Sequence, residues 1–356
     1  NVRNSQILVL ERHLDDVALA RSNAMLATLD RLKKDAYFLS GTPPISGIIR
    51  ASANSGFDEK ERSSLQLWSK RLQEIFAAYL ETHPSVMQVR YIGIANDGRE
   101  LVRVDRKDGR VRKINVMSLQ QKSDRDYFQE AITRHPGEVY VSEINLNREH
   151  GEIEVPYVPT LRLATPIVDQ NQKVFGILVI NLNMAEIFQS LTVELDANEN
   201  IYVLNNDGDF LLHPVQEKAF GFEFEKNYRW SDEFSTGEDE TDSAFIRLDN
   251  QSVVHAILRT MSYDSNQSVD LVVTAPDKII DKAVAKARLF NLYILFGFIC
   301  VSLMFLYLVA ANLRRRAQAD QQNATMAAIV GGTDDAIVSK TLDGVVQSWN
   351  HAAEVM

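Results

Sequence analysis

The residue types that usually carry out catalysis do not stand in catalytic arrangements in this sequence. There is no Ser-His-Asp set, no phosphate-binding glycine loop and no His-Glu-x-x-His motif. His351 lacks the helical surroundings of a phosphoacceptor histidine. His213 stands before Pro214 at the end of an expected strand, where a structural role is the simplest explanation. The sequence therefore predicts no catalytic residue in this chain.

The stretch from Arg125 to Ser142 holds the side chains best suited to binding a small molecule, and a helix is expected over its first part, residues 124–134. A guanidinium such as that of Arg125 can donate two parallel hydrogen bonds to a carboxylate. Tyr127 and Tyr140 add phenol hydroxyls. The alternative is plain packing, because aromatic side chains on a short amphipathic helix often belong to a core. Residue type alone leaves both interpretations open.

Acidic and histidine side chains also gather at Glu149, His150, Glu152 and Glu154, where oxygen and nitrogen atoms could hold a cation. Alternating charge on a loop or strand edge is usually a solvated face. The only cysteine, Cys300, excludes a disulfide and a cysteine-based zinc site. We therefore expect neither a metal nor a cofactor.

Composition and charge limit the class of protein. The chain of 356 residues is 45% hydrophobic and 24% charged, which is typical of two or three folded domains. Its net charge is -10, and no stripe of lysine and arginine is interleaved with aromatic residues. A nucleic-acid partner is therefore not expected.

The segment from Leu289 to Ala311 is apolar enough and long enough to cross a bilayer, whose hydrocarbon core is about 30 Å thick. The alternative is a buried core helix. Arg314, Arg315 and Arg316 follow at once, and positive charge beside a span stays on the cytoplasmic side. We expect residues 1–288 in the periplasm, residues 312–356 in the cytoplasm, and an earlier span upstream of residue 1.

Helical and strand patterns alternate before this segment. Apolar residues at helical spacing from residue 7 to 32 predict a long helix that ends at Gly41, and it serves as a core helix, a dimer seam or both. A second helix is expected over residues 65–80. Val86 to Asp105 reads as a hairpin around Asn96-Asp97-Gly98, and a further strand pair flanks residues 169–172. Similar hairpin units recur around residues 205–208 and 342–344, which indicates three related α/β domains.

This order of elements, with the run SDRDYFQEA at residues 123–131 and GILVINLNM at 176–184, resembles a double Cache periplasmic sensor over roughly residues 6–283. The end of the chain, from Thr333, resembles the start of a PAS domain. The expected fold class is α+β, with a long N-terminal helix, two tandem PAS-like (Cache) domains with antiparallel sheets, a transmembrane helix and a truncated PAS domain. The expected parts are a stalk helix (1–40), a membrane-distal ligand-binding domain (41–190), a membrane-proximal domain (191–284), a span (285–312), a helical linker (313–324) and the PAS start (325–356).

The resemblance also implies a ligand site. Cache domains that bind amino acids carry an Arg-x-Trp-Tyr-x-x-Ala run, which Arg125, Tyr127, Phe128 and Ala131 match in part, and Asn181 stands where such domains hold an ammonium-binding Asp. A charge-assisted bond contributes about 1.5–3 kcal/mol and a neutral one about 1, so a free α-amino acid is disfavoured. We expect a carboxylate or a neutral metabolite. The residues expected to bind it are Arg125, Tyr127, Phe128, Tyr140, Ser142 and Asn181.

The resulting hypothesis is a homodimeric receptor of the bacterial inner membrane that senses a small molecule outside the cell. Its output module, a histidine kinase or a GGDEF diguanylate cyclase, is expected beyond this chain. The run GGTDD at Gly331 to Asp335 is not a cyclase signature, because it precedes the last hairpin and lacks the acidic pair in place. A chemoreceptor or a membrane-tethered periplasmic binding module is the alternative.

Overall fold

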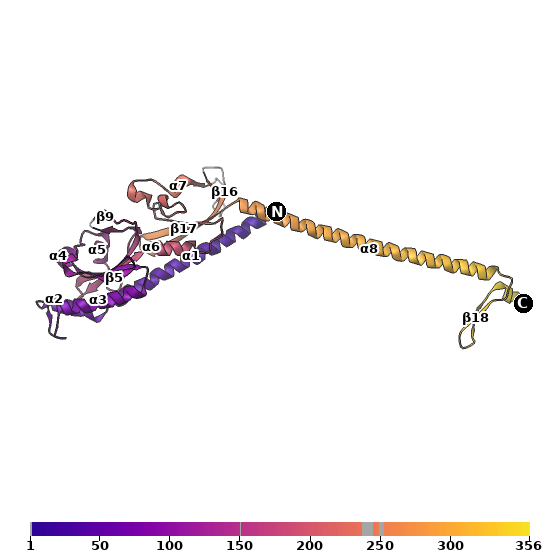
Figure 1. Cartoon of the computed structure of the whole chain (residues 1–356), viewed down its shortest axis with the longest axis horizontal. Helices are drawn as coiled ribbons and strands as arrows, with labels where there is room; N and C mark the ends of the chain where they lie inside the picture. The colour runs from indigo at the N-terminus through magenta and orange to yellow at the C-terminus, as the bar shows by residue number, and fades with distance from the viewer. Residues whose placement is uncertain (1, 150, 237–244, 249–252) are drawn as a thin grey trace. The chain divides into compact units, whose positions relative to one another are not determined.

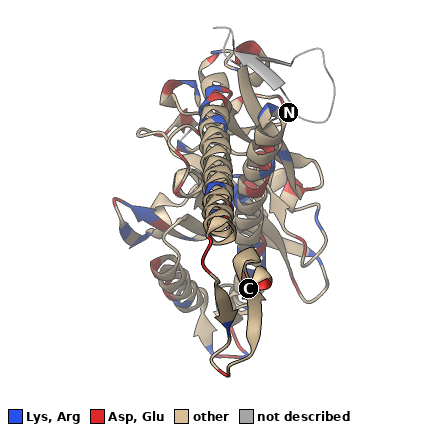
Figure 2. Cartoon of the chain, turned by 90° about the vertical axis from the view of Figure 1, so that its right-hand side faces the viewer, with Lys and Arg blue, Asp and Glu red and all other residues tan. Residues whose placement is uncertain are grey.

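The computed structural model describes residues 2–149, 151–236, 245–248 and 253–356. Two compact units make up the chain, one of residues 1–282 and one of residues 283–356. Figure 1 shows the first unit as two sheets with the long helix α1 along them. In Figure 2 acidic and basic residues are intermixed over the surface instead of gathering in one field of either sign.

The first helix, α1 (Val2–Ser40), ends where the sequence predicts, because Gly41 and Pro43 follow it. Its apolar stripe faces its own sheets, so the core-helix interpretation holds for this face: Leu14, Leu29 and Leu32 are fully buried. Helix α2 (Pro43–Ala53) begins at the proline pair. Helix α3 (Leu65–Thr82) is capped by Ser64, whose side chain accepts a hydrogen bond from the Leu67 amide.

The first sheet is antiparallel, as predicted, in the order β5-β4-β3-β11-β10-β6, with β7 also paired to β10. Its strands are β3 (Val86–Gly93), β4 (Glu100–Lys107), β5 (Arg110–Lys113), β6 (Tyr140–Val141), β7 (Asn145–Leu146), β10 (Pro159–Val168) and β11 (Val174–Asn183). The expected Asn96-Asp97-Gly98 turn joins β3 to β4, and all three residues have positive φ. This backbone conformation suits Asn, Asp and Gly.

The second sheet is also antiparallel, in the order β13-β12-β17-β16-β15-β14. Its strands are β12 (Asn200–Leu204), β13 (Phe210–Leu212), β14 (Phe234–Thr236), β15 (Phe245–Leu248), β16 (Val253–Asp264) and β17 (Gln267–Pro276). The hairpin of β16 and β17 turns through two residues, Ser265 and Asn266, because Asp264 pairs with Gln267. This long hairpin is not among the predicted ones.

Short elements complete the first unit. They are β1 (Phe57–Asp58), β2 (Ser63–Ser64), α4 (Ala95–Gly98), α5 (Asp126–Ala131), β8 (Arg148–Glu149), β9 (Glu152–Ile153), α6 (Met184–Thr192), α7 (Trp230–Glu233) and three 3-10 turns at Val116–Ser118, Gln216–Lys218 and Gly221–Phe224. Helix α5 is shorter than the expected helix over residues 124–134. One apolar core runs through α1, α3 and both sheets, with Leu29, Phe76, Ile180 and Leu271 among its members.

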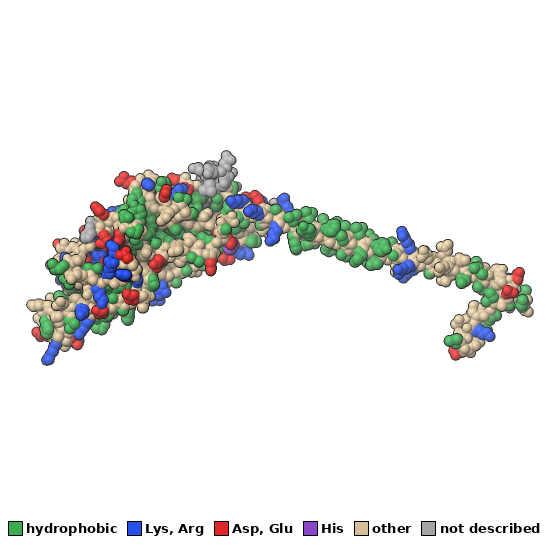
Figure 3. All heavy atoms as spheres, viewed as in Figure 1, with side chains coloured by type: hydrophobic (Ala, Val, Ile, Leu, Met, Phe, Trp, Pro, Cys, Tyr) green, Lys and Arg blue, Asp and Glu red, His purple; other side chains and the backbone are tan. Residues whose placement is uncertain are grey.

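Helix α8 (Lys278–Gly332) is a single unbroken helix of 55 residues. It is the one described helix apolar and long enough to cross a membrane, with a mean hydropathy of 2.6 over its most apolar window. Every side chain from residue 288 to 310 is exposed. Figure 3 shows this apolar band in green with blue basic side chains at both of its ends. Strands β18 (Val338–Lys340) and β19 (Val346–Trp349) and helix α9 (His351–Val355) follow it.

Candidate functional site

One face of the first sheet carries a row of polar side chains that strand register brings together. Arg162 of β10 lies opposite Asn181 of β11, Asn181 lies opposite Gln88 of β3, and Gln88 lies opposite Asp105 of β4. Because side chains alternate between the faces of a strand, Arg90 shares this face with Gln88. The opposite face is apolar and packs into the main core. The sheet thus presents polar groups on the side that α1 does not cover.

A cavity of about 430 Å³ lies over this row. Its size is within the usual range for small-molecule sites. Its walls come from the first sheet, from α5 and the loop before it, and from the tip of the β16–β17 hairpin. The lining residues that the argument below uses are Gln88, Arg90, Lys122, Arg125, Arg134, Tyr140, Arg162, Asn181 and Asp264.

Arg90 is buried at the centre of the polar row. Its guanidinium donates to the Tyr127 hydroxyl and to Asn181 Oδ1, each at 2.9 Å. Glu100 provides a carboxylate oxygen at 3.6 Å. The Arg90 Nε has no hydrogen-bond partner among the described atoms. Asn181 in turn donates to Gln88 Oε1 at 3.3 Å, so both ends of its amide are occupied.

Arg162 is buried to 8% exposure, and its guanidinium donates to Asn145 Oδ1 at 2.7 Å and Asn147 Oδ1 at 3.3 Å. No described carboxylate forms an ion pair with it. Burial, together with the nearby positive charge of Arg90, lowers the pKa of Arg162 to about 10. It therefore stays cationic at neutral pH, and its described partners are the two amides and the Tyr127 ring, whose centre lies 5.8 Å from the guanidinium.

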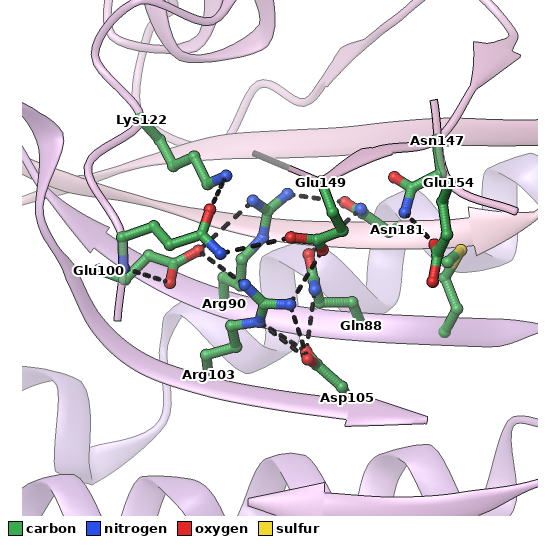
Figure 4. A network of polar contacts seen from close by, with 12 residues as sticks. Gln88, Arg90, Glu100, Arg103, Asp105, Lys122, Asn147, Glu149, Glu154 and Asn181 are labelled. Carbon is green, nitrogen blue, oxygen red and sulfur yellow. Dashed lines mark hydrogen bonds and ion pairs between the residues drawn. The ribbon is translucent and has the colours of Figure 1, made fainter. Parts of the chain in front are cut away.

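Lys122 is a third buried cation beside the cavity. Its ammonium donates to Gln120 Oε1 at 2.5 Å, and it too has no ion pair among the described residues. Burial, followed by the charge of Arg90, lowers the pKa of Lys122 to about 8. Figure 4 shows how Arg90, Lys122 and Asn181 belong to one polar network.

The acids of this network pair largely with other cations. Glu149 forms an ion pair with Arg103 at 3.0 Å and accepts a hydrogen bond from Gln120 at 3.3 Å, and Asp105 forms an ion pair with Arg103 at 2.7 Å. Glu149 was expected on a solvated face, and this was wrong, because the loop that carries it folds over the sheet. Glu154 accepts a hydrogen bond from Asn147, and His150 lies outside the described residues.

Five of the six predicted site residues line the cavity: Arg125, Tyr127, Tyr140, Ser142 and Asn181. Arg125 is the residue before the first turn of α5, and its nearest acid is Asp124 at 3.7 Å. The Ser142 hydroxyl accepts a hydrogen bond from the Arg162 amide. Phe128 differs, because its side chain packs with Ile92, Ala131 and Val179 in a small apolar cluster under α5.

Sequence reasoning missed Arg90 and Arg162, the two buried arginines. A signal was present in the sequence, since each is the only charged residue within an otherwise mostly apolar strand. A charge is almost never fully buried unless it is paired or has a function. The site can thus bind an anion through Arg162 and Lys122, two cations that form no ion pair within the described parts of the chain.

Comparisons with known proteins agree with a sensor fold. Residues 61–235 match the family model described as the sensor domain of bacterial histidine kinases. A domain of a sensory box/GGDEF family protein from Vibrio parahaemolyticus superposes with a TM-score of 0.56 at 15% identity, covering 79% of this chain and 100% of that chain. The extracellular domain of a protein described as a histidine kinase gives 0.55 at 15% identity, covering 80% and 95%.

The ligand-binding domain of the Campylobacter jejuni chemoreceptor Tlp3, in complex with L-valine, gives a TM-score of 0.51 at 12% identity, covering 79% of this chain and 98% of that chain. No curated protein matches the sequence. These likenesses show the fold, and residues 61–235 match the model of a bacterial histidine kinase sensor domain.

Proposed function

We propose that this chain, with its histidine kinase type sensor domain at residues 61–235, binds a small carboxylate outside the cell in the cavity over the first sheet. The observation that carries the proposal is the pair of buried cations, Arg162 and Lys122, for which the described residues supply no ion-pair partner within 4.0 Å. A buried charge is costly unless it is paired. A ligand carboxylate supplies the missing partner through charge-assisted hydrogen bonds.

A carboxylate without an α-ammonium group fits this site better than a free amino acid. Asn181 stands at the position where the Cache resemblance expects an ammonium-binding acid. Its oxygen already accepts from Arg90, and its amide already donates to Gln88. It therefore carries no negative charge to pair with a ligand ammonium, and its oxygen already accepts a hydrogen bond from the Arg90 guanidinium. L-valine is bound by the Campylobacter domain, and for this chain we propose a different ligand class.

Calorimetry with matched pairs of ligands tests this choice. The pairs are succinate with L-aspartate and isovalerate with L-valine, each differing by one ammonium group. We expect the deaminated member to bind about tenfold tighter in each pair, because the ammonium of the amino acid would lose its water without gaining a charged partner, at a cost of at least about 1.4 kcal/mol. Tighter binding of both amino acids would contradict the proposal.

We propose that α8 crosses the membrane. Residues 289–311 span the bilayer, and residues 1–288 lie in the periplasm. In intact cells, an impermeant maleimide should not label Cys300, although its side chain is exposed in the structure. In a cysteine-free background, Ala53→Cys should be labelled from outside and Ala319→Cys only in inverted vesicles. Labelling of Ala319→Cys in intact cells would reverse the proposed topology.

The output of the receptor is proposed from the comparisons. The family match favours a histidine kinase, and the Vibrio domain keeps a GGDEF cyclase as the second candidate. We further propose that the β18–β19 hairpin and α9 begin a PAS domain and that the receptor works as a homodimer. Membranes with the full receptor should incorporate phosphate from ATP into a histidine in a succinate-dependent way. Formation of cyclic diguanylate instead would favour the cyclase.

A further inference from the structure

The tip of the β16–β17 hairpin belongs to the second sheet but forms part of the cavity over the first sheet. Asp264, Ser265, Asn266 and Gln267 all line this cavity. These residues lie more than a hundred positions after α5 and β6, which form the neighbouring wall. The ligand site is therefore built by both sheets.

Polar contacts hold the tip against the cavity wall. Asp264 Oδ2 accepts from the Arg134 guanidinium at 3.2 Å and from the Val141 amide at 2.9 Å. The same guanidinium lies over the Tyr140 ring at 5.6 Å from its centre. Tyr140, Arg134 and Asp264 all line the cavity. The anchor of the tip is thus an ion pair at the ligand site itself.

The other end of the hairpin meets the start of α8. Strand β17 ends at Pro276 and α8 begins at Lys278. Between them, the Asp277 carboxylate contacts His255 of β16 at 3.0 Å and forms an ion pair with Arg3 of α1 at 2.6 Å. The two strands pair from Val254 and Pro276 to the tip. Ten residues of β17 cover about 33 Å at the usual rise of a strand.

We propose that the hairpin tip is a ligand-sensitive wall of the cavity, and that β17 carries its position to the first turn of α8. A bound carboxylate that reaches Arg134 competes with Asp264 for this guanidinium, because both are anions. Ligand binding then favours the state in which the tip is released, as differential affinity requires. The effect of the ligand rests on the proposed function, in which the cavity binds a carboxylate. The coupling between the tip and α8 rests only on the contacts of the hairpin.

Hydrogen exchange on the full chain in lipid nanodiscs tests the coupling without a ligand. Asp264→Asn removes the charge that holds Arg134. We expect exchange about tenfold faster at residues 265–269 and also faster at the first turn of α8, which is the effect of losing one hydrogen bond to a charged group. Asp270→Asn is the matched control on the same strand, since Asp270 contacts Thr260 and does not line the cavity. It should leave the first turn of α8 unchanged.

A faster tip with an unchanged first turn of α8, or an unchanged tip, would overturn the proposal. Arg134→Gln removes the other partner and should give the same exchange pattern, which keeps the test decisive if Asp264→Asn folds poorly. Adding succinate to the wild-type chain should reproduce the pattern of Asp264→Asn. If succinate does not bind while both variants act as expected, the ligand class is wrong and the coupling stands. If succinate binds and the tip does not change, the hairpin proposal fails.

Discussion

Replacing Arg162 by methionine separates a ligand-binding role from a structural one. Burial is the chief reason why the pKa of Arg162 falls from its ordinary value to about 10. At 1.36 kcal/mol per tenfold change, keeping this charge in the folded state costs about 3 kcal/mol. Both the folded and the unfolded pKa lie above pH 9, so the cost is fully present and constant between pH 5 and pH 9.

Methionine has a similar length and no charge, so Arg162→Met removes this cost. It also removes the hydrogen bonds that Asn145 and Asn147 accept, each of which contributes about 1.5–3 kcal/mol because the donor is charged. We therefore expect the free energy of unfolding to stay the same or to fall by up to about 3 kcal/mol. Succinate affinity should fall at least about tenfold, because a charge-assisted partner is lost.

Urea unfolding and calorimetry on residues 1–282, a compact unit of its own, measure the two effects. Arg125→Met is the matched control, since Arg125 lines the same cavity but is only half-buried and lies next to Asp124. Its effect on succinate affinity should be smaller than that of Arg162→Met. The reasoning is refuted if Arg162→Met lowers the free energy of unfolding by clearly more than about 3 kcal/mol, or if it still binds succinate as tightly as the wild type.

Two further predictions concern Lys122, in the loop before α5, and Gly98, in the β3–β4 turn. Lys122 loses its charge as the pH passes its pKa of about 8, so succinate affinity measured by calorimetry should fall about tenfold between pH 7 and pH 9. Lys122→Met should abolish this pH dependence, and an unchanged pH dependence in the variant would assign the titration to another group. Gly98 has a φ of +67°, and a Cβ there would lie 2.6 Å from the Ser123 nitrogen, so Gly98→Ala should lower the unfolding free energy by more than about 1 kcal/mol. Gly109→Ala, at a φ of +71° with open space around it, should cost less in the same urea series, and equal losses would rule out the steric explanation.

Features set by neighbouring residues could be predicted from the sequence. The turn at Asn96-Asp97-Gly98 requires positive φ, and Asn, Asp and Gly are the residue types that adopt positive φ most readily. The end of α1 at Gly41 and Pro43 follows from backbone chemistry in the same way. The apolar run in α8 needs no tertiary partner to be recognised.

Features that depend on sheet register could not be predicted in this way. Arg90 and Arg162 lie on β3 and β10, which are far apart in the sequence and are separated in the sheet by β11. Only the pairing of all three strands puts both guanidinium groups into one network. Family motifs directed attention to Arg125 and Phe128, of which the first lines the cavity and the second lies in the apolar cluster below.

The β16–β17 hairpin shows a further limit. Its turn, Ser265-Asn266, contains no glycine or proline, so the strongest local turn signal is missing. Its role at the cavity arises from the packing of one sheet on another, which no local pattern contains.

The absence of an ion pair to Arg162 among the described residues has a consequence for how such a receptor would respond to its environment. A guanidinium without its own acid attracts chloride, acetate or phosphate from the medium whenever the sensed molecule is away. Apparent affinity then falls in proportion to the occupancy of that background anion. The response then depends on the concentration of the sensed compound relative to that of competing anions. A dose–response curve therefore shifts with the buffer in which it is recorded.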